Sequence, residues 1–470
     1  MKTYVSLNSK IILITLAFTL LTACNNTGEL SDELPNFIIV FADDLGYGDL
    51  SSFGHPTIRT PNLDKMASEG MRFTQFYVAA NVCSPSRAAL LTGRLYIRSG
   101  VYPGVFFPNA ATGLPLDELT IAELLKTKGY KTAIIGKWHL GSQPEYLPTQ
   151  QGFDYYFGIP YSNDMGKVGS FGNNPDMAGF TRNYTPLPLY RNNEVIEEEP
   201  DQRQLTKRYT DEVLKFIRDN QDKPFFVYYP NNFPHTPLYA SEDFEGISRR
   251  GLYGDVVQEL DWSIGQIIKE LRELKLDKKT MVVFTSDNGP WLMMREFGGS
   301  AGLLFEGKAT TYEGGMREPM IAWWPGKIPS NTVNEALASS LDIMPTIMAM
   351  AGIEMPGDRE YDGMDISGLL YQETDKVRDI IYYYHGDVLR AIRKGPWKAH
   401  FETQMSYSRE PAKKHDPPLL YNLENDPSEK YEIGNKHPDI IKEMKELYDH
   451  QISTVIPAES ETSKVIDNNE

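Results

Sequence analysis

The run Cys83-Ser84-Pro85-Ser86-Arg87 places a thiol and a guanidinium group four residues apart, close to one turn of a helix. The other of the two cysteines in the chain, Cys24, closes an N-terminal apolar segment. Cys83 is therefore not expected to form an intrachain disulfide. It is either a small buried apolar residue or a reactive or modified centre beside Arg87.

Acidic and amide side chains follow two apolar runs of the sequence. Asp43 and Asp44 stand after the first run, and Asp287 and Asn288 stand after the second. Adjacent carboxylates repel each other unless they cap a turn or bind a cation. These four side chains offer only oxygen ligands, which favours calcium first and magnesium second over zinc. An Asx turn is the alternative for each pair taken separately.

Five cationic or titratable side chains complete a candidate site: Arg87, Lys137, His139, His235 and Lys308. Taken one at a time, each lysine is most simply a solvated surface charge, and each histidine is most simply structural. Together they supply what a tetrahedral oxyanion requires, which is hydrogen-bond donors, positive charge and two groups that move protons near neutral pH.

Strands alternate with helices up to about residue 355, which predicts an α/β sheet covered on both faces. The polar clusters repeatedly follow the strands. Because ligand sites of such folds gather at the carboxyl ends of strands, we expect the clusters to converge. Strands are expected at residues 36–42, 131–135, 225–229 and 281–285, and helices at residues 61–70, 85–91, 119–128, 206–219 and 255–275.

A smaller antiparallel subdomain is expected after this sheet. Residues 380–384, 388–392 and 397–401 have the length and spacing of hairpin strands, and residues 440–452 have the pattern of a helix. The predicted domains are a catalytic domain at residues 35–354 and a C-terminal α+β subdomain at residues 355–470.

The N-terminus has the pattern of an export signal. Lys2 and Lys10 flank a short apolar segment that ends in Leu21-Thr22-Ala23-Cys24. This ending resembles a bacterial lipobox, so we predict a lipoprotein signal peptide at residues 1–23, a lipid anchor on Cys24 and a polar tether at residues 24–34. The protein would then be an exported bacterial lipoprotein, in the periplasm or anchored at the outer membrane or cell surface. An ordinary signal peptide is the alternative.

The formal net charge of −17 excludes nucleic-acid binding through a broad basic field. Positive charge for an anionic substrate therefore has to be local.

Taken in order, the motifs resemble those of the type I, formylglycine-dependent sulfatases, and the chain is similar to the arylsulfatases among them. The similarity extends from about Pro35 to Pro427 and covers many separate motifs, so it is far more specific than any one pattern. The motifs are Cys83-Ser84-Pro85-Ser86-Arg87 with Thr92-Gly93, Gly136-Lys137-Trp138-His139-Leu140-Gly141, Gln151-Gly152-Phe153, Gly158-Ile159-Pro160-Tyr161-Ser162, Thr285-Ser286-Asp287-Asn288-Gly289-Pro290 and Thr310-Thr311-Tyr312-Glu313-Gly314-Gly315.

The resemblance implies an alkaline phosphatase-like mixed sheet sandwiched by helices, with a smaller C-terminal antiparallel-sheet domain. It also implies that a maturation enzyme oxidises Cys83 to Cα-formylglycine. Calcium would be bound by this residue together with Asp43, Asp44, Asp287 and Asn288.

The catalytic roles implied by the resemblance start from the hydrated aldehyde as nucleophile. Arg87 and Lys137 would hold and polarise it, and His139 would take a proton when sulfate is eliminated. Lys308 would bind sulfate oxygens, and His235 would protonate the leaving alcohol. Ser162 matches a further polar position of the pocket, so Ser162, Lys137, His235 and Lys308 are the predicted substrate-binding residues.

The predicted activity is hydrolysis of sulfate monoesters of a carbohydrate, such as a galactose-type sugar, or of an aryl sulfate. Residues 165–204 are expected to border the substrate pocket. One alternative is a phosphatase or phosphodiesterase of the alkaline phosphatase superfamily, which would commonly use Ser or Thr with two zinc ions. The other is a lipoprotein that binds sulfated glycans without catalysis.

Overall fold

The computed structural model describes Met1, residues 34–167 and residues 184–466. The predicted signal peptide, Cys24 and all of the tether except Leu34 lie outside these residues. Within the described ranges, no helix is both long and apolar enough to cross a membrane.

In the described residues, an eleven-stranded mixed sheet forms the centre of the fold, with the order β10-β2-β9-β8-β1-β7-β3-β4-β5-β6 and β11 beside β2. The central strand β1 pairs in parallel with β7 and β8, whereas β9 runs antiparallel to β8 and β2. The strands are β1 (Asn36–Ala42), β2 (Met71–Tyr77), β3 (Lys131–Ile135), β4 (Tyr155–Gly158), β5 (Pro188–Arg191), β6 (Glu194–Glu198), β7 (Phe225–Pro230), β8 (Thr280–Ser286), β9 (Arg317–Trp323), β10 (Thr332–Asn334) and β11 (Ala338–Ser339).

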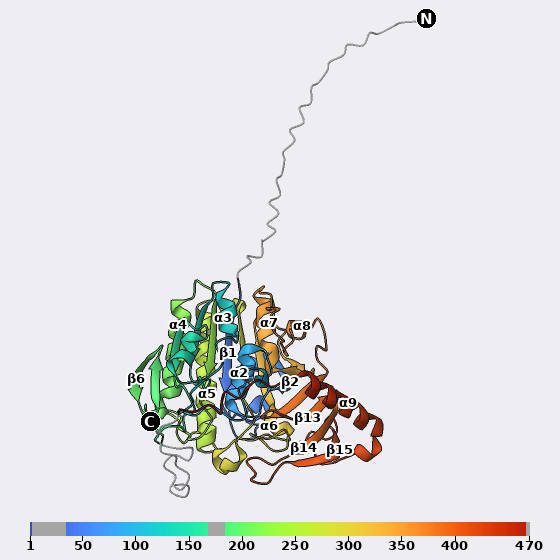
Figure 1. Cartoon of the computed structure of the whole chain (residues 1–470). Helices are drawn as coiled ribbons and strands as arrows, with labels where there is room; N and C mark the ends of the chain where they lie inside the picture. Colours follow the sequence, from blue (N-terminus) through green and yellow to red (C-terminus); the bar gives the residue numbers. More distant parts are fainter. Residues whose placement is uncertain (2–33, 168–183, 467–470) are drawn as a thin grey trace. The chain divides into compact units, whose positions relative to one another are not determined.

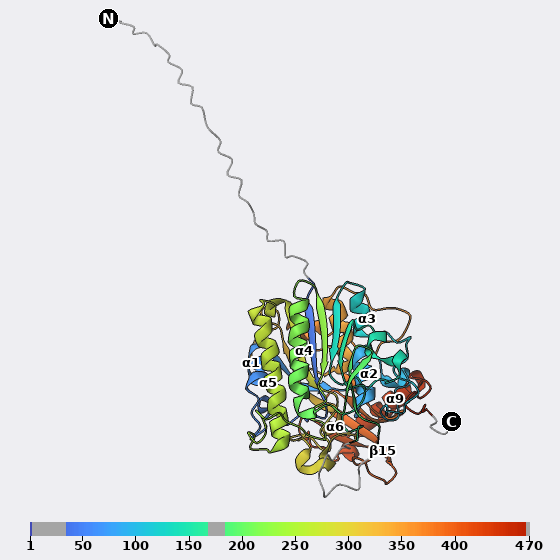
Figure 2. The ribbon, with the colours of Figure 1, turned by 90° about the vertical axis from the view of Figure 1, so that its left-hand side faces the viewer.

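Helices cover both faces of this sheet, so the predicted fold class is confirmed (Figure 2). Alternate residues of β1 enter two separate cores. Phe37 and Ile39 pack in the core with the helices α2, α3 and α7, and Ile38 and Val40 pack in the core with α1, α4 and α5. The helices are α1 (Pro61–Glu69), α2 (Cys83–Thr92), α3 (Ile121–Lys126), α4 (Leu205–Asp219), α5 (Leu252–Glu273), α6 (Glu313–Met316), α7 (Ile343–Met350), α8 (Ser367–Leu370) and α9 (Pro438–Thr454).

A second, four-stranded antiparallel sheet follows in the order β12-β13-β14-β15, and α9 packs on it (Figure 1). This arrangement confirms the predicted C-terminal antiparallel sheet. Its strands are β12 (Ile380–His385), β13 (Val388–Lys394), β14 (Trp397–Thr403) and β15 (Lys413–Asn422).

Buried charges join the second sheet to α6. Lys398 Nζ lies 2.9 Å from Glu313 Oε1 and 3.0 Å from Glu429 Oε1, and these side chains have no solvent exposure. The adjoining Gly314 packs so closely on Gly289 that a Cβ atom on Gly289 would lie 1.9 Å from the Gly314 carbonyl oxygen. The network therefore supports the segment next to Asn288.

The helix ends differ from the predicted boundaries by up to three residues, and the largest difference is at α5, which spans Leu252–Glu273 in place of the expected residues 255–275. The helix expected at residues 119–128 is α3 (Ile121–Lys126), because Thr120 and Glu123 form a capping box that starts the helix at Ile121. The helix α2 begins at Cys83 itself rather than after it.

Candidate active site

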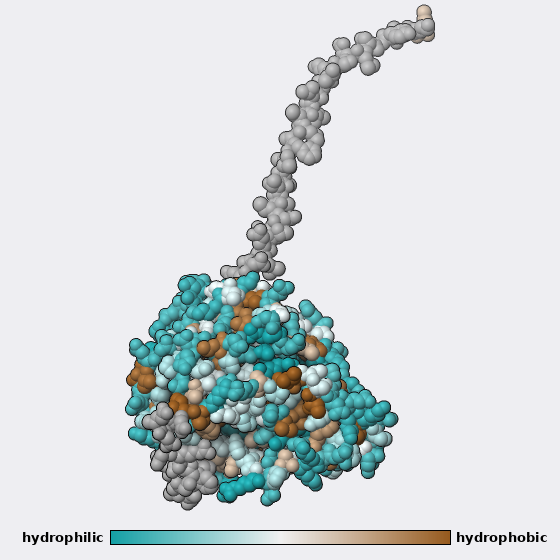
Figure 3. All heavy atoms as spheres, in the orientation of Figure 1, coloured by the Kyte–Doolittle hydropathy of each residue, from teal (hydrophilic) through white to brown (hydrophobic). Residues whose placement is uncertain are grey.

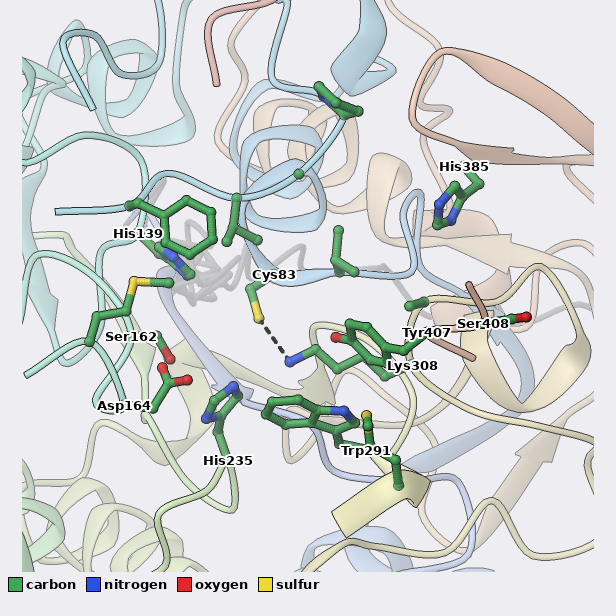
Figure 4. Close-up of a pocket in the computed structure, with 18 of the residues that line it drawn as sticks. Cys83, His139, Ser162, Asp164, His235, Trp291, Lys308, His385, Tyr407 and Ser408 are labelled. Carbon is green, nitrogen blue, oxygen red and sulfur yellow. Dashed lines mark hydrogen bonds between the residues drawn. The ribbon is translucent and has the colours of Figure 1, made fainter. Parts of the chain in front are cut away.

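Cys83 lies at the first position of α2, facing the carboxyl ends of β1 and β8. Its Sγ atom is 3.4 Å from Asp43 Oδ1. The same sulfur is 3.6 Å from Lys308 Nζ, a contact that Figure 4 marks with a dashed line. Its side chain is buried, with a residue exposure of 2%. Burial, reinforced by Asp43, raises the pKa of the Cys83 thiol well above its ordinary value. An unmodified Cys83 would thus be a protonated thiol and a weak nucleophile.

Two cations hold Asp43. Arg87 Nη2 lies 3.4 Å from Asp43 Oδ2 and 2.7 Å from Asp287 Oδ2. Lys137 Nζ donates to Asp43 Oδ2 and also lies 3.2 Å from Ser162 Oγ. Burial by itself would raise the pKa of Asp43, but Lys137 and other neighbouring cations hold it well below its usual range. Asp43 is therefore ionised.

Asp44 is the second carboxylate at the end of β1. Asn288 Nδ2 donates to Asp44 Oδ1 at 2.7 Å, and the Asp44 backbone N–H donates to Asp287 Oδ1 at 3.1 Å. Lys308 Nζ lies 2.9 Å from Asp44 Oδ2, and His235 Nε2 lies 3.7 Å from the same oxygen. Asp44 thus joins the predicted metal ligands to the predicted sulfate-binding residues.

The residues fit a hard divalent cation. Ligand atoms of Asp43, Asp44, Cys83 and His235 all lie within 4.8 Å of one another. Among the described residues, the buried Oδ1 of Asn288 has no hydrogen-bond partner. Burial, followed by the charge of Asp43, raises the pKa of Asp287 to about 6, a shift that a bound cation would oppose. Four of these side chains would hold the ion through oxygen atoms: Asp43, Asp44, Asp287 and Asn288.

His139 is fixed by its neighbours. Its Nε2 lies 3.1 Å from the Phe106 carbonyl oxygen. Ser84 Oγ donates to the His139 carbonyl at 2.7 Å and accepts from the Phe106 N–H at 3.1 Å. Burial, then the charges of Lys137 and Arg87, lower the pKa of His139 well below its ordinary 6.5. With Nε2–H bound to the carbonyl, Nδ1 is the nitrogen that accepts a proton.

A cavity of about 580 Å³ opens above Cys83, and His139, Ser162, His235 and Lys308 line it. Figure 4 shows these side chains around the Cys83 sulfur. Of residues 165–204, which are expected to border the pocket, Met165 and Tyr184 line the cavity, and residues 168–183 lie outside the described residues. The face in Figure 3 carries mostly hydrophilic residues, with hydrophobic ones in small separate groups.

Other walls of this cavity are not among the residues predicted from sequence. Trp291 and Tyr407 stand with ring centroids 5.5 Å apart. Asp164 lies beside Ser162 and His235 in Figure 4, and His385 comes from the second sheet. These side chains sit on loops or strand ends that meet only in the folded chain, and no local motif marks them.

The structure brings every predicted site residue to this one place, and all of them are buried: Asp43, Asp44, Cys83, Arg87, Lys137, His139, Ser162, His235, Asp287, Asn288 and Lys308.

Family models agree with this fold and site. One described as Sulfatase matches residues 35–353, and one described as C-terminal region of aryl-sulfatase matches residues 376–469. The chain belongs to the sulfatase family and is a sulfatase, an enzyme that hydrolyses sulfate esters.

Particular relatives place it among the arylsulfatase-type members. Arylsulfatase A of Homo sapiens is 43% identical over 441 residues, which cover 88% of this chain and 87% of that protein. The N-acetylgalactosamine-6-sulfatase of Canis lupus familiaris is 39% identical, covering 90% of this chain and 87% of that protein. The crystal structure of PsFucS1 sulfatase from Pseudoalteromonas sp. aligns with a TM-score of 0.81 at 30% identity and covers 92% of each chain. That of Ps i-CgsB with k-i-k-neocarrahexaose aligns with a TM-score of 0.77 at 29% identity, covering 93% of this chain and 96% of that chain.

Proposed function

We propose that Cys83 is converted to Cα-formylglycine and that this residue, with a calcium ion beside it, hydrolyses the sulfate monoester of a carbohydrate. The observation that carries the proposal is the position of Cys83, with Sγ 3.4 Å from Asp43 Oδ1 and 3.6 Å from Lys308 Nζ at the base of the cavity. The motif from Cys83 to Arg87 supports the conversion, which needs a formylglycine-generating maturation enzyme as a partner.

The proposed modified residue and ion would supply complementary chemistry. Formylglycine would provide a hydrated aldehyde, with one hydroxyl for attack and a second for expelling sulfate. Asp43, Asp44, Asp287 and Asn288 would hold calcium, or magnesium as the second choice, which would stabilise negative charge.

The surrounding side chains position charge and move protons. Lys308 faces residue 83 and holds a fixed positive charge for the sulfate oxygens. Lys137 keeps Asp43 in place and orients Ser162 toward the cavity. His139 accepts a proton at Nδ1, and His235 donates one to the leaving alcohol. The burial and contacts described above support these proposed roles.

A sulfated sugar of the galactose type is the proposed substrate. Trp291 and Tyr407 offer apolar ring faces to a sugar. The Asp164 carboxylate accepts hydrogen bonds from hydroxyls and repels further anionic groups. Two relatives support a carbohydrate: N-acetylgalactosamine-6-sulfatase by its name, and Ps i-CgsB by its bound neocarrahexaose.

Two measurements on protein from the native host test this function. Peptide mass analysis should find an aldehyde in place of the Cys83 thiol, and wild-type protein should release sulfate from a galactose sulfate. Cys83→Ala, which cannot be oxidised to an aldehyde, should fold but release none. A native protein that keeps a free Cys83 thiol and full turnover would refute the formylglycine assignment. Failure on every galacto-configured sugar would refute the substrate assignment only.

The N-terminal pattern supports export and a lipid anchor on Cys24, in the periplasm or at the outer membrane or cell surface. The protein extracted from host membranes should carry an acyl group on Cys24. The Cys24→Ser variant should instead appear in the soluble fraction. Wild-type protein with no acyl group on Cys24 would contradict the anchor.

A further inference from the structure

Residues 456–466, here named the C-terminal strap, run along residues 97–112, here named the wall loop. Ala110 and Val465 form an antiparallel bridge between them. Four backbone hydrogen bonds of 2.7–2.9 Å join the two segments. In each pair, the N–H of the first-named residue donates to the carbonyl of the second: Ala458 to Ile97, Glu461 to Gly100, Ile466 to Asn109 and Ala111 to Lys464.

Side chains of the strap converge on Tyr102. Ser460 Oγ and Thr462 Oγ1 both donate to the Tyr102 carbonyl, and the Tyr102 hydroxyl donates to the carbonyl of Ala458. The two segments also pack closely, since a Cβ atom on Gly100 would lie 2.1 Å from the Glu459 carbonyl oxygen. The strap is therefore bound to the loop by specific contacts along its length.

The wall loop forms part of the active site. Pro103, Gly104, Val105 and Phe107 line the cavity. Between them, the Phe106 carbonyl contacts His139 Nε2 at 3.1 Å, and the Phe106 N–H donates to Ser84 beside Cys83. Tyr102, which the strap holds, stands next to the first of these cavity residues.

We infer that the C-terminal strap positions the wall loop, and through it the imidazole of His139, for catalysis. Tyr102, Ser460 and Thr462 are positioning residues, because they do not touch the cavity. The inference rests on the sulfatase activity of this site. Release of the strap lets the loop move, which disturbs both the cavity wall and the hydrogen bond that fixes the His139 tautomer.

The full chain with Ser460→Ala and Thr462→Val tests the strap, because both hydroxyls that bind the Tyr102 carbonyl are removed. One such hydrogen bond shifts an equilibrium about fivefold, so removal of both should lower kcat/KM on an aryl sulfate by up to about 25-fold. Amide hydrogen exchange should rise in residues 97–112, and the acid limb of the pH profile should shift with His139. Ser460→Thr and Thr462→Ser, which keep both hydroxyls, should retain wild-type values.

Ser453→Ala with Thr454→Val is the matched control, since within the described part of the chain these hydroxyls bond only to carbonyls of α9. A chain ending at Val455, assayed with and without a peptide of residues 456–466, gives a second test. The peptide should restore activity. The inference would be overturned if the strap variant kept wild-type activity, or if the strap variant and the control lost activity equally. Either result is decisive whether or not the shortened chain folds. An inactive wild type would refute the proposed function instead.

Discussion

Lys308 Nζ lies 3.6 Å from Cys83 Sγ, and the same nitrogen lies 2.9 Å from Asp44 Oδ2. One ammonium group thus faces both the nucleophile position and a predicted metal ligand. Burial by itself would lower the pKa of Lys308, but Asp44 and Cys83 raise it well above its ordinary value. With Asp44 as its main partner, the Lys308 ammonium is charged at neutral pH.

Removing this charge should impair sulfate transfer. We expect Lys308→Met to lower kcat/KM on an aryl sulfate by about 10²–10³, the cost of losing one donor to a developing oxyanion. Lys308→Arg keeps the charge and should recover part of the loss. Steady-state kinetics on protein with verified formylglycine content measures both, and an unchanged kcat/KM in Lys308→Met would remove Lys308 from the site.

Chelation should remove activity and lower stability. A ligand at about 100 times its Kd stabilises the folded state by about 2.7 kcal/mol, so chelator treatment should lower Tm. Calcium should restore Tm and sulfate release better than magnesium. Asp44→Asn should blunt the response of Tm to calcium. Recovery with zinc and not with calcium would contradict the predicted ion.

The pH optimum should be acidic. Burial, then Lys308, lowers the pKa of His235, and burial, then Lys137, lowers that of His139 well below 6.5. Activity should fall as rising pH deprotonates the donor His235, and as falling pH protonates the acceptor His139. Since kcat/KM reports the free enzyme, its maximum should lie below pH 6.5, the ordinary histidine value. His235→Gln should flatten the alkaline limb, and an optimum above neutrality would argue against these roles.

Asp164 should separate sugar from aryl substrates. Hydrogen bonds to a charged group contribute about 1.5–3 kcal/mol, so Asp164→Asn should lower kcat/KM on a galactose sulfate by about tenfold or more. An aryl sulfate lacks sugar hydroxyls, and its turnover should change little. Equal losses on the two substrates would show that Asp164 acts on the chemistry rather than on sugar recognition.

The buried contact between Lys398 and Glu313 should matter for stability. Lys398→Met leaves Glu313 and Glu429 without their shared cation, and breaking a buried pair costs about 3–5 kcal/mol. Lys394→Met is the matched control, because both Lys394 and its partner Glu443 are partly exposed. Loss of this exposed ion pair should lower the free energy of unfolding by less than about 1 kcal/mol. Urea unfolding measures the loss of stability in each variant. Equal losses would contradict the stabilising role of the buried Lys398 contacts.

Sequence patterns predict much of the site because its acidic residues directly follow strands. The continuous apolar runs of β1 and β8 identify buried strands, so Asp43 and Asp287 meet at one edge of the sheet. The Thr120 and Glu123 spacing also carried a usable signal for the start of α3, since a capping box is readable from sequence.

Other parts depend on tertiary contacts. Nothing local in Arg317–Trp323 indicates that β9 runs antiparallel between β8 and β2. Trp291 and Tyr407 belong to loops far apart in the sequence, and their contact exists only after both sheets have packed. The Phe106 carbonyl offers His139 a backbone atom, which any residue type provides, so no side-chain pattern reveals it.

The contacts between residues 97–112 and 456–466 join segments that lie far apart in the sequence, with a separation of 356 residues between Tyr102 and Ala458. Contacts of such long separation form late and slowly, because the loop between them has to be closed first. During synthesis, the strap is also the last of the described segments to leave the ribosome. The cavity wall is therefore completed only after residues 456–466 have been synthesised and have packed against residues 97–112.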